Sequence, residues 1–308
     1  MKSSLFEHVA VFANSDGANS HTKEFLDVLS EQSDRDVAII GLAEKLPLYT
    51  RFPAGRRKER IEALIGTAAN AVVVDLVANC EAAGISPKSQ RVLEGRFPGA
   101  LLDWLQTHQA TLVVKESLPC DDHHGNASKG DIRLARHSKT SVLLAHAPIQ
   151  RGAPIIVAIA PYWADPSADA FWIDLIDTAA DVAKLFHSPL HIVHAWALWG
   201  ENLIRSRAGD EECESELEAE KSHATEAVER VLGKVDLQGV PTETHLDKGS
   251  PTRVLGDAID GLNPSLVVLG PTASRGPLGS LLGATAESLA IRKETSVLIV
   301  KTGGNRSD

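Results

Sequence analysis

The residues that could bind a charged ligand are gathered in one glycine-rich stretch near the C-terminus. This stretch, LVVLGPTASRGPLGSLLGATAESLA, covers residues 266–290, and its apolar run ends at Gly270. Gly270 and Gly276 give a backbone that can come close to a ligand. Free N–H groups beside Gly283, where a helical pattern begins, favour an anion. The pattern predicts a phosphate-binding loop; the alternative is that these glycines only shape a tight connection.

A second group of polar side chains occupies residues 120–125, which read CDDHHG. Cys120, His123, His124 and the two aspartates between them offer sulfur, nitrogen and oxygen, the donor atoms that zinc accepts. Adjacent side chains of one loop seldom converge on a single ion without help from elsewhere in the chain. The default interpretation is therefore a solvated polar loop, with zinc as the alternative.

Composition limits the classes of function. The chain has 308 residues, 43% of them apolar and 23% charged, and a formal net charge of −10. This charge argues against a nucleic acid or an anionic membrane as partner, because both attract clustered positive charge. The three cysteines form no CxxC pair, so we expect reduced thiols and a cytoplasmic location. No stretch resembles the roughly 20 apolar residues of a membrane span.

The chain contains an internal repeat. HVAVFANSDG near the start resembles IIVAIAPYWAD at 155–165, and the segment at 94–115 resembles that at 248–270. TSVLLA at 140–145 likewise resembles TSVLIV at 295–300, and all three matches keep their order. The polar residues 145–154 join the two halves. We therefore expect two domains, at residues 1–148 and 152–303.

Each half alternates short apolar strand patterns with helical patterns, which is typical of a parallel sheet covered on both faces. Long helices are expected at about 55–83 and for about 25 residues from 211. The predicted fold class is α/β, with two doubly wound, Rossmann-like domains, each a five-stranded parallel sheet flanked by helices. Ligands of such sheets bind beyond the carboxyl ends of the strands.

The strand, glycine loop and helix, followed by the last strand SVLIV, resemble the universal stress protein family. The layout in two halves and the segment KGSP at 248–251 are most similar to its tandem, E-type members. Nucleotide-binding members carry Gly-x2-Gly-x9-Gly-[Ser/Thr] at this loop. Gly270 matches the first glycine and Gly283 the last. The resemblance implies a ligand site in the second domain formed by Gly270, Gly276, Gly283, Ala284 and Thr285.

The sequence departs from the family motif at several positions. Ala273 replaces the second glycine, Ala284 replaces the phosphate-binding Ser or Thr, and Ala160 stands where ATP-binding members have an aspartate. In the first half an offset of 155 residues places Lys115 opposite Gly270, and none of the motif glycines remains. We therefore expect no nucleotide in the first half, and ATP or AMP as ligand candidates only in the second.

These features leave several functions open. The leading interpretation is a cytosolic, non-enzymatic stress-response protein that senses a small anionic ligand. The resemblance implies an internal pseudo-dimer that pairs residues 141–145 with 296–300, and two chains could associate further as a homodimer. Alternatives are an ATP-binding protein with slow hydrolysis, a ligand-free scaffold, and a binder of an apolar metabolite beside Trp163, Trp196 and Trp199. No sequence motif marks a catalytic residue, and nothing identifies protein partners.

Overall fold

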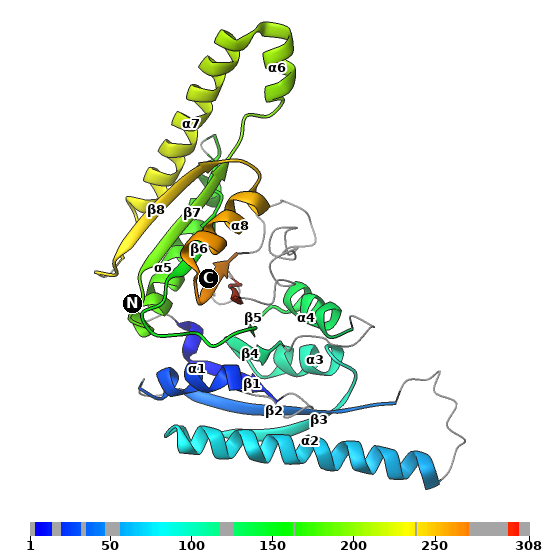
Figure 1. Cartoon of the computed structure of the whole chain (residues 1–308). Coiled ribbons are helices and arrows are strands. Elements are labelled where there is room, and N and C mark those ends of the chain that lie inside the picture. The colour runs from blue at the N-terminus through cyan, green and yellow to red at the C-terminus, as the bar shows by residue number, and fades with distance from the viewer. Residues whose placement is uncertain are drawn as a thin grey trace.

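The first half of the chain alternates strands and helices, as the sequence predicts. The computed structural model (Figure 1) describes residues 4–13, 20–31, 35–46, 56–117, 126–162, 164–237, 239–270 and 295–301. The strands of the first half are β1 (His8–Phe12), β2 (Asp36–Glu44), β3 (Ser89–Gly95), β4 (Leu112–Glu116) and β5 (Ser141–Ala145). Its helices are the 3₁₀ turn η1 (Ser4–Phe6) and α1 (Ser20–Ser30), α2 (Arg56–Ala82), α3 (Gly99–Thr107) and α4 (Asn126–His137).

The second half follows the same alternation. Its strands are β6 (Ile155–Ile159), β7 (Leu190–Trp196), β8 (Thr242–Lys248), β9 (Leu266–Leu269) and β10 (Ser296–Ile299). Its helices are the 3₁₀ turn η2 (Pro166–Ala168) and α5 (Asp169–Leu185), α6 (Glu201–Ala208), α7 (Asp210–Leu232) and α8 (Pro251–Leu262). The helix predicted near 283–293 lies outside the described residues.

All ten described strands form one sheet, in the order β3-β2-β1-β4-β5-β10-β9-β6-β7-β8. Each half contributes five parallel strands in the same relative order, and the two sets meet at their last strands. There β5 and β10 pair antiparallel, with Leu143 opposite Leu298. The predicted α/β fold class and the pairing of 141–145 with 296–300 are confirmed.

The junction between β5 and β10 is reinforced by two serines at matching positions of the repeat. Ser141 Oγ accepts a hydrogen bond from the Lys301 backbone N–H at 3.0 Å. Ser296 Oγ accepts from the Ala147 N–H at 3.2 Å and donates to the Ala147 carbonyl at 2.6 Å. These bonds hold the ends of the two antiparallel strands together.

The two faces of the sheet are packed differently. On one face, α1, α2, α5 and α7 contribute to a single hydrophobic core that runs through both halves. Phe25 of α1 stacks on Phe186, which follows α5, with ring centroids 6.5 Å apart. On the other face, α3 and most of α4 cover the first half, while α8 covers the second as a separate cluster. The first face therefore joins the halves through its core as well as through the strands.

Helix α2 corrects the expectation that no stretch resembles a membrane span. Residues 57–82 are long and apolar enough, by length and composition alone, to cross a membrane. Their charged residues cluster at the start of the helix, and Asp75 is the only one within residues 63–80. In the structure, Val73 and Leu76 pack into the core, and α2 runs along β2 and β3 (Figure 1). Only 22% of its apolar 18-residue window is buried, and Leu64 and Val74 are each 61% exposed.

Candidate functional site

The carboxyl ends of the second-half strands form the edge at which the predicted ligand site lies. Strands β6, β9 and β10 run parallel and adjacent, so their last residues meet there. Gly270 directly follows β9, and Lys301 follows β10. Of the predicted site residues, Gly276, Gly283, Ala284 and Thr285 lie outside the described residues, and so do Cys120, His123 and His124 of the zinc hypothesis.

Gly270 has a packing role that the sequence did not reveal. A Cβ atom at this position would lie 2.4 Å from Phe171 Cζ and 3.2 Å from Leu175 Cδ2, both on α5. A larger residue here would require the Phe171 ring to move. Glycine at this position therefore lets Phe171 of α5 pack closely against the end of β9, whatever ligand the edge binds.

Lys301 is a polar group of this edge that sequence reasoning missed. Its Nζ atom is buried and has no hydrogen-bond partner among the described residues. Burial lowers the pKa of its ammonium group to about 8. A buried lysine with a strongly lowered pKa, at the ligand-binding edge of an α/β sheet, is a candidate counter-ion for an anion. The sequence feature that could have revealed Lys301 is its position directly after the apolar strand SVLIV.

Strand register shows that the offset used to compare the two halves is wrong by one residue at β4. Ser141 and Ser296 occupy matching positions of TSVLLA and TSVLIV. Ser141 pairs with Leu112, and Ser296 pairs with Leu266. LVVKE therefore aligns with LVVLG without a gap, which the shared LVV also supports.

This correction changes the counterpart of Gly270 from Lys115 to Glu116. Glu116 is fully buried. Its carboxylate accepts hydrogen bonds from the His21 N–H at 3.0 Å and the Ser20 hydroxyl at 3.5 Å, at the start of α1. Burial raises the pKa of Glu116, and His21 together with the hydrogen bonds opposes that rise. The first half thus places its own carboxylate on a helix N-terminus, where a bound anion would otherwise be favoured.

Lys115 completes the polar network of the first-half edge. Its Nζ lies 3.0 Å from Asp131 Oδ1 and donates to the Glu116 carbonyl at 3.0 Å. Ser117 donates to the other oxygen of Asp131. Lys115, Ser117 and Asp131 are all buried. The described protein groups therefore pair with one another at this edge, and the absence of a nucleotide from the first half stays a prediction.

A pocket of about 370 Å³ opens elsewhere in the second half, between α7 and the ends of β7 and β8. Trp196, Leu217 and Leu246 supply its apolar lining, and four charged side chains complete it: Glu214, Glu218, Lys221 and Lys248. Trp199 is 90% exposed and does not line this pocket. Trp163 lies outside the described residues. Of the two described tryptophans in the hypothesis, Trp196 lines this pocket and Trp199 does not.

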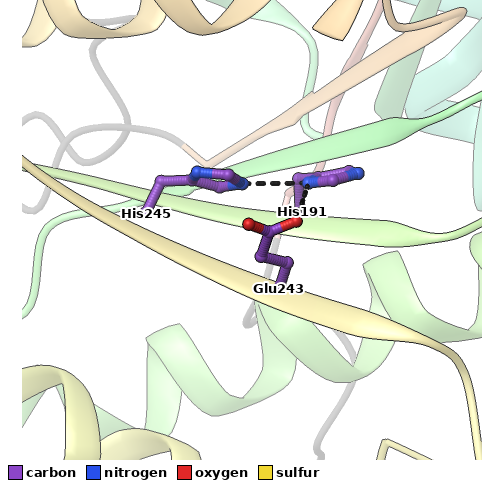
Figure 2. A group of neighbouring side chains, drawn as sticks. All are labelled: His191, Glu243 and His245. Carbon is purple, nitrogen blue, oxygen red and sulfur yellow. Dashed lines mark hydrogen bonds and ion pairs between the residues drawn. The ribbon is translucent and has the colours of Figure 1, made fainter.

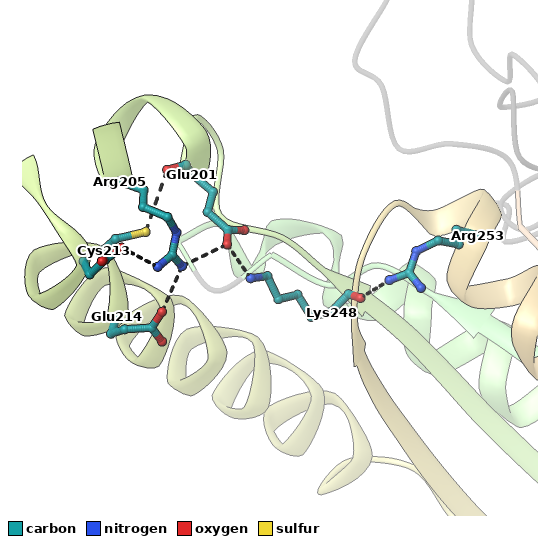
Figure 3. Close-up of polar contacts among 7 residues, drawn as sticks. Glu201, Arg205, Cys213, Glu214, Lys248 and Arg253 are labelled. Atoms are coloured by element: carbon teal, nitrogen blue, oxygen red, sulfur yellow. Dashed lines mark hydrogen bonds and ion pairs between the residues drawn. The ribbon is translucent and has the colours of Figure 1, made fainter. Parts of the chain in front are cut away.

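Ion pairs fasten the arm formed by α6 and α7 beside this pocket (Figure 3). Glu201 accepts hydrogen bonds from Lys248 Nζ at 2.7 Å and from Arg205 at 3.4 Å. Arg205 also pairs with Asp210 at 3.0 Å and Glu214 at 2.8 Å. The hydrogen bond from Lys248 is the largest of the effects that lower the pKa of Glu201. The network links the end of edge strand β8 to both helices of the arm.

His194 has a structural role. The side chain is buried, and its Nδ1 donates to the Ile159 carbonyl at 3.0 Å. Burial lowers the pKa of this imidazole, although the hydrogen bond to Ile159 opposes the change. His194 thus ties β7 to the end of β6.

The fold defines a doubly wound α/β protein whose two halves repeat the same strand order. Residues 164–301 match the model of the Universal stress protein family. The second half of the chain therefore carries a domain of this family. No curated protein matches the sequence.

Solved structures with the same fold extend over nearly the whole chain. A protein from Pseudomonas aeruginosa UCBPP-PA14, assigned to the universal stress proteins, superposes with a TM-score of 0.64 at 18% identity, covering 96% of this chain and 93% of that one. A universal stress protein from Archaeoglobus fulgidus DSM 4304 gives 0.62 at 17% identity, covering 96% and 97%. At these identities the likeness concerns the fold of both halves.

Proposed function

We propose that the chain is a tandem universal stress protein, with domains at residues 1–148 and 152–303, and that its second domain binds a phosphate-bearing ligand. The protein is non-enzymatic in this proposal and acts in the cytosol as a ligand sensor in the stress response. ATP and AMP are the first candidates, because the glycine loop partly keeps the nucleotide motif. Thr285 would supply a hydroxyl one residue after the position of Ala284.

The contrast between the two halves is the observation that carries this proposal. At the carboxyl edge of the first half, the carboxylate of Glu116 takes the N–H groups at the start of α1. At the same edge of the second half, glycine stands in place of Glu116, and buried Lys301 has no hydrogen-bond partner among the described residues. An anion bound there would compensate the buried positive charge.

Ligand binding at this edge would act on the conformation of the second domain. Lys301 follows β10, whose pairing with β5 joins the halves. An anion that binds one arrangement of this junction more tightly than another shifts the population toward it. We infer that the output is a change in the binding of protein partners.

Native mass spectrometry of freshly purified, tag-free protein tests the proposal. The expected result is one nucleotide per chain, identified after denaturation, and a melting temperature that rises with added ATP because ATP binds only the folded state. Lys301→Met should lose both effects, whereas Lys58→Met, a change on α2, should keep them. Empty protein whose melting temperature does not respond to ATP or AMP would favour the ligand-free scaffold instead.

Two alternatives predict different outcomes of the same experiment. An ATP-binding protein with slow hydrolysis would release ADP from added ATP, and Lys301→Met would stop this release. An apolar metabolite would bind in the pocket of Trp196, Leu217 and Leu246, the observation that favours this second candidate. Recovery of such a compound, lost on Leu217→Glu and kept in Lys301→Met, would support it.

A further inference from the structure

Three potential metal-binding side chains meet on the neighbouring strands β7 and β8. His191 is the second residue of β7, and Glu243 and His245 lie on the edge strand β8. Glu243 is paired directly with His191, and His245 is two residues further along the same strand. Residues two apart on a strand point to the same face. Strand pairing therefore places all three side chains together near the amino end of the strands.

The donor atoms of these residues converge. His191 Nδ1 lies 2.9 Å from His245 Nε2 and 3.7 Å from Glu243 Oε2. One potential ligand atom from each residue lies within 4.8 Å of the others. Figure 2 shows the two imidazoles end to end across the strands, with the carboxylate beside His191.

These separations are close to those of ligands around one metal ion. With metal–nitrogen bonds of about 2.05 Å, two nitrogens lie about 2.9 Å apart at a right angle and about 3.3 Å apart at the tetrahedral angle. In the structure the 2.9 Å between His191 Nδ1 and His245 Nε2 is a hydrogen bond. A metal ion bound by both nitrogens would replace this bond, and coordination at a right angle needs nearly the same separation. Tetrahedral coordination would need a separation larger by a few tenths of an ångström, which the exposed strand could provide.

The His191 side chain is largely buried. Glu243 itself is 66% exposed, so solvent can reach the group and an ion can enter.

We propose that His191, Glu243 and His245 bind a divalent late transition metal ion, Cu²⁺ or Zn²⁺. Two imidazoles and a carboxylate suit these ions, whereas Mg²⁺ and Ca²⁺ prefer sites made of oxygen ligands. Three protein ligands leave coordination positions for water. The site is separate from the Cys120, His123 and His124 hypothesis, since it uses other residues in the other half of the chain.

The test uses tag-free, full-length protein that carries Cys120→Ser, His123→Ala and His124→Ala. These changes remove the donors of the zinc hypothesis for residues 120–125, and this variant is the background protein. Equilibrium dialysis against CuCl₂ and ZnCl₂ measures the number and affinity of bound ions. We expect one ion per chain. His245→Gln should weaken binding at least tenfold and Glu243→Gln several-fold. Electron paramagnetic resonance of the Cu²⁺ form should show coupling to two nitrogens, falling to one in His245→Gln.

His187→Asn is the matched control, because His187 is exposed in the turn before β7 and asparagine tolerates its positive φ of 51°. This variant should bind as the background protein does. Thermal melting without metal establishes that every variant is folded. The proposal is overturned if the background protein binds neither ion at micromolar concentration, or if His245→Gln and His187→Asn bind equally well.

Discussion

Glu116 and the buried Nζ of Lys301 lie at equivalent edges of the sheet, and they differ in their hydrogen bonding. Glu116 is surrounded by hydrogen-bond donors of α1, whereas Lys301 Nζ has no hydrogen-bond partner among the described residues. A buried charge without a partner lowers stability. Such a group is retained more readily at a binding site, where function compensates its cost.

Replacing Lys301 by methionine should stabilise the ligand-free protein. Burial lowers the pKa of Lys301 from 10.5 to about 8. After allowance for its partial exposure, we expect Lys301→Met to raise the free energy of unfolding at pH 7 by about 1–2 kcal/mol. Urea unfolding followed by circular dichroism measures this difference.

The stability advantage of Lys301→Met over the wild type should shrink as the pH rises above 8. Above pH 8 folded Lys301 loses its proton, while the unfolded chain keeps one up to about pH 10.4. The wild type therefore gains stability relative to Lys301→Met across this window, because its unfolded state binds more protons. If the free energy of unfolding of Lys301→Met exceeds that of the wild type by the same amount from pH 7 to pH 10, the burial of the Lys301 charge is contradicted.

Glu116→Ala should destabilise the first half by about 1–3 kcal/mol, because backbone N–H groups at the start of α1 lose their acceptor. The same change would expose a helix N-terminus to solutes. We therefore expect sulfate to restore part of the lost melting temperature in Glu116→Ala, beyond its general effect on the wild type. Equal effects of sulfate on the two proteins would show that no anion replaces the carboxylate.

Among the helices and strands, the sequence predicted those with clear periodic patterns. The long helices α2 and α7 were expected close to their observed ranges, and the described strands follow the expected alternation with helices. The prediction omitted α1, an 11-residue helix whose buried residues include Phe25 and Leu29. It also omitted α6, which has no buried residue and therefore no apolar pattern. Polar contacts, which strand and helix periodicity does not report, hold α6 in place.

The arm formed by α6 and α7 should loosen when its ion-pair network is removed. In Arg205→Leu the contacts of Arg205 to Glu201, Asp210 and Glu214 are lost together. Because these pairs are exposed, we expect a change in global stability below about 1 kcal/mol. Hydrogen exchange of the amides in residues 201–208 should nevertheless accelerate, as measured by mass spectrometry. Unchanged exchange there would show that the network does not hold α6.

The two halves share one sheet and one of its cores, so they should unfold together. Phe186 is fully buried and stacks on Phe25 of the other half. Phe186→Ala should cost about 3–5 kcal/mol. Circular dichroism and tryptophan fluorescence should still report one common transition at a lower temperature. Leu203→Ala, at a position 59% exposed, is the control and should change little. Separate transitions for the two halves would contradict this coupling.

The candidate sites could be predicted from the sequence only in part. The repeat and the glycine pattern predicted the candidate ligand edge, since both are properties of sequence order, and that assignment stays a prediction. Lys301, the role of Glu116 and the meeting of His191 with His245 depend on which strands lie side by side. His191 and His245 are 54 positions apart along the chain, and the pairing of β7 with β8 brings them together. Such convergence cannot be read from spacing alone.

Calorimetric titration with MgATP tests most directly the claim that only the second half keeps a ligand edge. The account predicts one site per chain in the wild type and in Lys58→Met, and loss of that site in Lys301→Met. Two sites per chain, or one site that survives Lys301→Met unchanged, would contradict it.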